Sequence, residues 1–242
     1  MKDFLINKAR NAEITDKRLS TGAAVLDKLL NGGMEKEVIT TVYGPAGSGK
    51  SNICLIAAVT AAKRGSQVIY IDSEGGFSIE RLKQLTDNDL SVLNNIIILQ
   101  PTTFEEQKKV FAKLKSVITD KIGLIVVDTI SMLYRLELGK SEDVYIINRE
   151  LGRQISQLTE ITRKRHIPVL VTNQVYANFD DRDRVNMVGG DIIKYGSKCL
   201  VELQIARGFR VATLRKHRSI PEGKNVLFRI ENKSLEEVSE QH

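Results

Sequence analysis

Cysteine is scarce in this 242-residue chain, which contains only Cys54 and Cys199. Two cysteines so far apart are too few for a disulfide framework or a zinc ribbon. We interpret both as buried core residues, and we expect a protein of a reducing, intracellular compartment.

Long apolar runs are also missing. The longest one, from Ile53 to Ala62, is interrupted by Thr60 and is far shorter than the ~18 residues of a membrane span. The first ten residues, MKDFLINKAR, lack the apolar segment of a secretory signal. We therefore expect no association with a membrane.

Aromatic residues are few, with seven Phe, six Tyr and no Trp. This scarcity argues against a single-strand-binding surface of the oligonucleotide-binding-fold type, in which bases stack on aromatic rings. Basic residues outnumber acidic ones by 36 to 30, which gives a net charge of +6. Such an excess permits a polyanionic partner, although solvated helix faces would account for it equally well.

The composition, 42% hydrophobic and 27% charged, is that of an ordinary globular protein. At about 150 residues per domain, the length predicts one large domain. We expect a short N-terminal segment over 1–18, one core over 19–230, and a polar C-terminal tail over 231–242 that frays.

Short apolar strands alternate with longer helices. The strands are predicted at 38–43, 67–72, 96–99, 122–128 and 168–172. The helices are predicted at 21–30, about 50–64, from 103 onward and about 143–165. This alternation predicts an α/β fold with a mostly parallel sheet and helices on both faces. Strands expected at 199–206, 209–216 and 225–230, joined by tight turns, add an antiparallel C-terminal extension.

The segment GPAGSGKS at residues 44–51, called the P-loop below, matches the phosphate-binding pattern G-x-x-x-x-G-K-[ST]. It lies between a predicted strand and a predicted helix. Glycines let backbone N–H groups converge on phosphate oxygens, and the helix N-terminus adds positive potential. Lys50 is expected to reach the β- and γ-phosphates and Ser51 to bind magnesium. The predicted nucleotide-binding residues are Gly44, Pro45, Ala46, Gly47, Ser48, Gly49, Lys50 and Ser51. The expected cofactors are ATP and Mg²⁺.

Three polar residues follow predicted parallel strands, where ligands bind in such sheets. Asp128 ends the strand at 122–128, and we expect it to hold magnesium or its water. Glu74 lies just past the second strand and could orient and deprotonate an attacking water. Gln174 follows the fifth strand, and its neutral amide could detect the γ-phosphate.

Several motifs occur together in one order. They are Leu19-Ser-Thr-Gly22, Leu26-Asp27, Gly32-Gly33, the P-loop, Ile71-Asp-Ser-Glu74, Val127-Asp128, Thr172-Asn-Gln174 and Gly189-Gly190-Asp. Over about Leu19 to Ile230 this set resembles the RecA/RadA recombinase superfamily, and within it most closely the archaeal RadB family of short RadA paralogues. The resemblance implies a RecA-type ATPase core that assists homologous recombination and DNA repair.

The resemblance also implies roles for individual residues. Glu74 corresponds to the catalytic base and Gln174 to the nucleotide sensor, beside Lys50 of the P-loop. The two DNA-binding segments that face the filament axis correspond to about 135–143 and 175–188. We therefore expect Arg135, Arg182 and Arg184 to contact DNA, although aspartates next to the last two partly cancel their charge.

Two features of RadA are missing from the chain. It has only about 18 residues where RadA carries a helix-hairpin-helix domain, and it has no Phe-x-x-Ala segment to link subunits. We therefore expect DNA binding (single-stranded or branched), weak ATP hydrolysis, weak or conditional homo-oligomers and no strand exchange of its own. The expected partners, by resemblance, are the RadA recombinase and branched-DNA nucleases. We expect the protein in the cytoplasm, associated with the nucleoid.

Lys216 stands where RadA has an aspartate, if Ile220-Pro221-Glu222 is aligned with the family's Leu-Pro-Glu. In RadA that aspartate helps to hold a cation near the γ-phosphate of a neighbouring subunit. An ammonium group could occupy the position of that cation. Lys216 is therefore a candidate contact to a neighbour's ATP, and an exposed strand-end residue is the alternative.

Three other functions remain open. An ATP-gated mediator or DNA-binding module would use the same fold without hydrolysis. A small-molecule kinase of P-loop type would need an arginine-bearing lid, and no insertion of suitable length carries one. A helicase-like ATPase of RecA fold is disfavoured by the motifs at Leu19–Gly33 and Thr172–Val175.

Overall fold

A computed structural model describes residues 18–140, 143–177 and 185–238. Its main sheet has nine strands in the order β13-β12-β11-β10-β3-β7-β6-β4-β5. The strands are β3 (Ile39–Tyr43), β4 (Gln67–Asp72), β5 (Ile96–Leu99), β6 (Ile122–Asp128), β7 (Val169–Asn173), β10 (Cys199–Ala206), β11 (Phe209–Lys216), β12 (Asn225–Ile230) and β13 (Leu235–Glu237). Strands β3 to β7 and β10 pair in parallel, and β10 to β13 pair antiparallel. The predicted fold class is confirmed.

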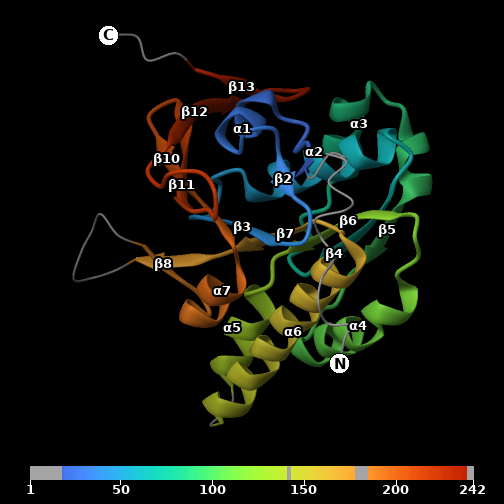
Figure 1. Cartoon of the computed structure of the whole chain (residues 1–242), viewed down its shortest axis with the longest axis vertical. Coiled ribbons are helices and arrows are strands. Elements are labelled where there is room, and N and C mark those ends of the chain that lie inside the picture. The colour runs from blue at the N-terminus through green and yellow to red at the C-terminus, as the bar shows by residue number, and fades with distance from the viewer. Residues whose placement is uncertain (1–17, 141–142, 178–184, 239–242) are drawn as a thin grey trace, which may run out of the picture.

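Helices cover both faces of this sheet (Figure 1). They are α1 (Ala24–Leu29), α2 (Lys50–Lys63), α3 (Ile79–Thr86), α4 (Phe104–Val117), α5 (Met132–Leu138), α6 (Val144–Arg165) and α7 (Gly190–Gly196), with a 3-10 helix at Leu90–Asn95. One buried cluster joins the sheet to α1, α2 and α3, and a second joins it to α4 through α7. Cys54 and Cys199 are both buried and free, as expected.

Two small hairpins lie outside the main sheet. Strand β1 (Arg18–Leu19) pairs with β2 (Met34–Glu35), and β8 (Val175–Ala177) pairs with β9 (Val185–Met187). In Figure 1 the β8 hairpin projects away from the body of the domain, beside α7. No helix in the described part of the chain is both long enough and apolar enough to cross a lipid bilayer.

The predicted start of the first helix is wrong. The helix begins at Ala24 rather than Thr21, because Asp27 holds the preceding residues in a turn. The Asp27 carboxylate accepts hydrogen bonds from the Thr21 backbone N–H, the Thr21 hydroxyl and the Ser20 hydroxyl. Gly22 has φ +81°, and a Cβ there would lie 2.0 Å from the Thr60 hydroxyl oxygen on α2. This motif therefore fastens α1 to α2.

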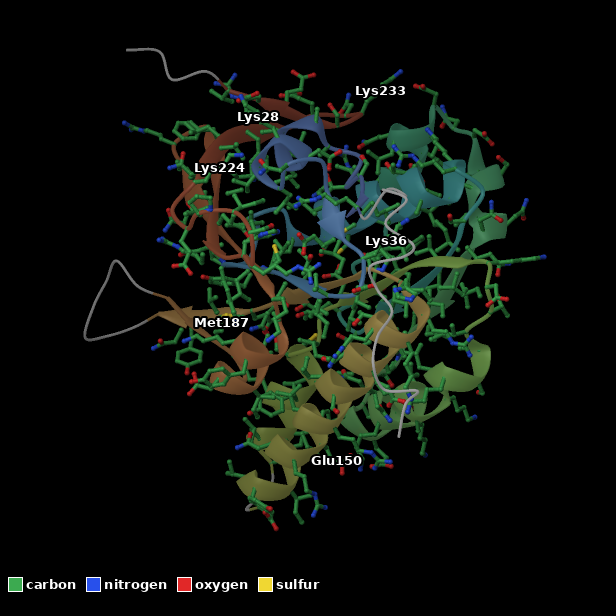
Figure 2. The ribbon with its side chains drawn as sticks, viewed as in Figure 1. Lys28, Lys36, Glu150, Met187, Lys224 and Lys233 are labelled. Carbon is green, nitrogen blue, oxygen red and sulfur yellow. The ribbon has the colours of Figure 1, made fainter. Side chains whose placement is uncertain are left out.

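The prediction of a fraying tail from residue 231 is wrong for the described part of that segment. Strand β13 pairs with β12 at the edge of the sheet, and Leu235 is buried against the core. The ion pair from Lys28 Nζ to Glu237 Oε1 spans 2.6 Å and ties β13 to α1. Lys224 Nζ also donates to the Lys28 carbonyl at 2.7 Å, and Figure 2 shows both lysines at this corner of the molecule.

Candidate nucleotide-binding site

The loop between β3 and α2 requires glycine at positions where other atoms approach closely. A Cβ on Gly44 would lie 2.4 Å from the Leu203 carbonyl oxygen, and one on Gly49 would lie 2.9 Å from Ile230 Cδ1. Gly47 and Gly49 also have φ of +75° and +103°, the left-handed region that favours glycine. The predicted P-loop therefore has its required context, a strand before it and a helix after it.

Lys50 begins α2 and is 92% buried, with only 8% of its surface exposed. Its Nζ donates to the carbonyl oxygens of Gly44 and Pro45, each at 2.8 Å. Burial lowers the pKa of Lys50, and the nearby carboxylates of Glu74 and Asp128 oppose that shift. The ammonium group thus lies at the loop, beside two acids and bonded only to neutral oxygens.

Asp128 lies at the end of β6 and is almost completely buried. Its carboxylate accepts hydrogen bonds from the hydroxyls of Thr172 at 2.5 Å and Tyr70 at 3.1 Å. Burial raises the pKa of Asp128, and the hydroxyl groups of Thr172, Ser51 and Tyr70 oppose the shift. The structure therefore places Asp128 and Ser51, the two predicted magnesium ligands, beside one another at the loop.

The described residues contain no group of three or more His, Cys, Asp and Glu side chains that could hold a metal ion alone. The pair formed by Ser51 and Asp128 nevertheless suits magnesium, which prefers oxygen ligands, keeps several waters and takes others from phosphates. A Cβ on Gly76 would lie 3.3 Å from Ser51 Oγ and 3.5 Å from Asp128 Oδ2, so the absence of a side chain there leaves room beside both oxygens.

Glu74 and Gln174 come from different strand ends and contact one another. Gln174 Nε2 donates to Glu74 Oε1. Although Glu74 is exposed overall, desolvation of its carboxylate raises the pKa, as does Asp128, whereas Gln174 and Lys50 lower it. The predicted base and the predicted sensor therefore lie side by side at the carboxyl ends of the parallel strands, where the P-loop also lies.

Asp72, the last residue of β4, was not predicted as a site residue. Its carboxylate accepts hydrogen bonds from the backbone N–H groups of Gly76 at 2.9 Å and Phe77 at 3.1 Å. Gln100 Nε2 donates to it at 3.3 Å. These contacts fix the loop that carries Glu74. The sequence feature that could have indicated this role is that Asp72 is a second acidic residue, two positions before Glu74.

Gln174 also connects the site to the β8–β9 hairpin. Its backbone N–H donates to the Ser131 hydroxyl at 3.1 Å, and its carbonyl accepts from the Val188 N–H at 3.0 Å. Its side-chain Oε1 is buried without a partner. The backbone of Gln174 is thus held between α5 and the residue that follows β9, while its side chain faces Glu74.

The candidate DNA contacts are only partly covered by the structure. Arg135 is exposed on α5, a helix that the sequence did not predict. Arg182 and Arg184 lie outside the described residues. The structure adds two exposed aromatic side chains near the predicted DNA-binding segments: Tyr176 on β8 is 53% exposed and Tyr195 on α7 is 74% exposed.

Lys216 ends β11, and its Nζ donates to the Lys194 carbonyl oxygen in α7 at 2.7 Å. Burial and the nearby Lys198 lower the pKa of Lys216, and Glu222 opposes the shift. In this single chain the ammonium group is thus bonded to α7 rather than to the P-loop.

Comparisons with known proteins show which proteins the chain is similar to. The model of the Rad51 family matches residues 12–238. The DNA repair and recombination protein RadB of Methanococcus maripaludis strain C7 is 43% identical over 220 residues, which cover 90% of this chain and 100% of that protein. RadB of Methanobrevibacter smithii is 44% identical over 218 residues, covering 87% and 92%. A crystal structure of the RadB recombinase matches with a TM-score of 0.78 and 38% identity, covering 91% of this chain and 100% of that one.

Proposed function

Because the chain belongs to the Rad51 family, and within it to the RadB group, we propose that it is an ATP- and DNA-binding protein of homologous recombination and DNA repair. The observation that carries the proposal is the meeting of Lys50, Ser51, Glu74, Asp128 and Gln174 at one edge of the sheet. These residues come from the ends of four different strands, and each has the chemistry that ATP binding or hydrolysis needs.

In the proposed site the P-loop amides and Lys50 bind the phosphates of ATP. The Ser51 hydroxyl would hold magnesium directly, and Asp128 would hold it directly or through a water. When bound, magnesium would neutralise charge on the β- and γ-phosphate oxygens. The hydroxyl donors of Tyr70 and Thr172 keep the Asp128 carboxylate oriented beside Ser51.

Glu74 would accept the proton of the attacking water, and the raised pKa of its carboxyl group makes it a better base than an ordinary glutamate. One of its oxygens accepts a hydrogen bond from Gln174 Nε2, which orients the carboxylate, and the other oxygen could accept the proton of the water. Weak hydrolysis remains part of the proposal by resemblance to the family.

The proposed ATPase is tested by Glu74→Gln, with phosphate release measured with and without DNA. Because general base catalysis contributes about 10²–10⁴-fold, turnover should fall by at least about 100-fold while ATP affinity stays within about threefold. Glu80→Gln is the matched control, since Glu80 pairs only with Lys83 on the surface of α3. A parent that binds ATP but releases no phosphate would favour the non-hydrolysing mediator, and a parent that binds no ATP would contradict the proposal.

DNA binding is proposed for the surface that carries Arg135, Tyr176 and Tyr195, together with Arg182 and Arg184. Arginine neutralises phosphates, and exposed tyrosines offer faces on which bases can stack. Replacing Arg182 and Arg184 together by Ala should lower the slope of log affinity against log salt concentration by about two. An unchanged slope would move the proposed contact to another basic segment, the run Arg215-Lys216-His217-Arg218 at the end of β11. Through DNA, the protein would be associated with the nucleoid.

We also propose that subunits of the protein associate weakly or conditionally, through the edge of the sheet formed by β5. Strand β5 is one of the two edge strands, and a groove beside it is lined by apolar and polar side chains: Leu99, Pro101, Val110 and Val117 together with Gln100, Glu106, Lys109 and Lys113. An extended segment of another subunit, or of a RadA-type partner, could pair with such an edge. The same docking mode would serve the proposed branched-DNA nucleases. Light scattering with and without ATP and DNA tests self-association.

A further inference from the structure

Arg210 belongs to β11, in the antiparallel extension, and yet it reaches the P-loop. It pairs with Ile205 on β10 and with Phe228 on β12, so its backbone is held on both sides. In Figure 1 the hairpin of β10 and β11 stands beside β3, the strand that leads into the P-loop.

The stem and the guanidinium group of Arg210 both contact that loop. Arg210 Nη2 donates to the Gly47 carbonyl oxygen at 3.4 Å, the upper limit for a hydrogen bond. A Cβ on Gly49 would lie 3.9 Å from Arg210 Cδ and 2.9 Å from Ile230 Cδ1. The two side chains of the extension therefore pack against the loop where it leads into α2.

Among the residues that the structure describes, the Gly47 carbonyl is the one acceptor for the donors of Arg210. Its Nε atom is buried without an acceptor, and no described carboxylate lies within ion-pair distance of its guanidinium group. Arg215 and Arg229 differ, since Arg215 pairs with Glu202 at 2.5 Å and Arg229 Nε donates to the Gly208 carbonyl at 3.1 Å. Arg210 as a whole is half-buried, so its guanidinium group keeps free donors beside the loop that an anionic ligand could use.

We propose that Arg210 is a nucleotide-binding residue outside the P-loop motif, whose free N–H groups donate to phosphate oxygens of the nucleotide bound in the same subunit. This inference rests on the proposed ATP binding. A guanidinium group presents several donors in one plane and suits phosphate better than a second lysine would. Arg210 adds a second cation to the site beside Lys50 and makes nucleotide affinity depend on the extension.

The test is Arg210→Met, which keeps the apolar stem and removes the charge and the donors. Charged hydrogen bonds contribute about 1.5–3 kcal/mol, so ADP and ATP affinity should each fall by about 10–100-fold in calorimetric titrations without DNA. Adenosine affinity should not change. The matched control is Arg207→Met in the turn between β10 and β11, because Arg207 is exposed and makes no hydrogen bond or ion pair with the described residues. It should bind as the parent does.

The outcomes separate this inference from the proposed function. A parent that binds no nucleotide overturns both. A parent that binds ATP, together with an Arg210→Met variant of equal affinity, overturns the role of Arg210 alone, and so does an equal loss in Arg207→Met. If Arg210→Met does not fold, Arg210→Lys is used instead. Lysine keeps the positive charge but lacks the several planar N–H donors of the guanidinium group. The affinity of Arg210→Lys should fall about fivefold, and parental affinity would refute the proposal.

Discussion

The parallel half of the sheet and its antiparallel extension meet where β3 pairs with β10, and both contribute to the P-loop. In the parallel half the site residues lie at strand ends, in short motifs, because the carboxyl ends of parallel strands meet at one edge. In the extension they are single side chains within strands, such as Ile230 against Gly49 and Arg210 against Gly47. In the parallel half, the residues of the site can therefore be recognised from sequence motifs. In the antiparallel extension they belong to no motif, and only their tertiary contacts bring them to the P-loop.

The two regions also share one hydrophobic cluster. Val42 and Ala57 of the parallel half belong to the same buried cluster as Leu203, Leu214 and Phe228 of the extension. Two regions that share a core are expected to unfold together. The following experiments test how far the two regions depend on one another.

The largest effect is expected for Phe228→Ala, which empties a fully buried position in β12. Loss of a buried phenyl ring costs about 3–5 kcal/mol in the free energy of unfolding. Urea unfolding followed by circular dichroism and by nucleotide binding should show one transition at a lower midpoint. Phe209→Ala, at a half-buried position of β11, is the control and should cost about 1 kcal/mol. Two separate transitions would show that the extension is an independent unit.

Next in size is Lys50→Ala, which removes the buried cation of the parallel half. ATP affinity should fall by about 100-fold, because a charged hydrogen bond to phosphate contributes up to about 3 kcal/mol. Calorimetry measures the affinity, with Lys63→Ala at the other end of α2 as control. Within the described part of the chain, Lys63 Nζ donates one hydrogen bond, to the Leu85 carbonyl, so affinity should not change in this variant. An unchanged affinity in Lys50→Ala would exclude the P-loop as the ATP site.

A smaller effect is expected for Asp72→Asn, which tests how much the loop that carries Glu74 depends on its hydrogen bonds to the end of β4. The side-chain amide of asparagine has one oxygen acceptor where aspartate has two, so one of the hydrogen bonds from the Gly76 and Phe77 N–H groups is lost. The loop that carries Glu74 should then be less well ordered. Turnover should fall about tenfold with ATP affinity within about threefold, since the lost hydrogen bond contributes about 1.5 kcal/mol. Asp87→Asn, on the surface after α3, is the control. An equal loss of affinity and turnover would assign Asp72 to nucleotide binding instead.

The smallest effect is expected at the far end of β11, for Lys216→Asp. If Lys216 meets a neighbour's γ-phosphate, the parent needs no potassium, and the variant should gain a potassium-dependent ATPase of about two- to threefold over sodium. ATP-dependent assembly and phosphate release are measured in both salts at equal ionic strength. Lys194→Asp is the control, because it changes the charge at an exposed site nearby. Strong potassium dependence of the parent would refute the trans contact.

Much of this protein could be read from local patterns. The strands at 67–72, 96–99, 122–128, 199–206, 209–216 and 225–230 have the bounds that were predicted, because buried strands are short, apolar and bounded by turn residues. The P-loop, Asp128, Glu74 and Gln174 were named because a phosphate site needs those residue types after parallel strands. Their predicted roles await the experiments above.

Other elements carried too little local signal. Helix α5 and helix α7 have seven residues each, and β13 has three, so neither helical periodicity nor strand alternation could be recognised over such lengths. The hydrogen bonds of Asp72 could not be foreseen either, because a strand-end aspartate serves equally well as a ligand or as an anchor for the next loop.

The sequence by itself determined the fold class, the position of the glycine-rich loop between β3 and α2 and the order of the residues around it, because these depend on spacing along the chain. Only the tertiary structure decided that Gln174 bonds to Glu74, that Ser51 lies beside Asp128, and that Arg210 contacts Gly47. The partners in each pair are far apart in sequence. Their contact depends on how the strands are ordered and on which faces pack together, and no local pattern of residues encodes that.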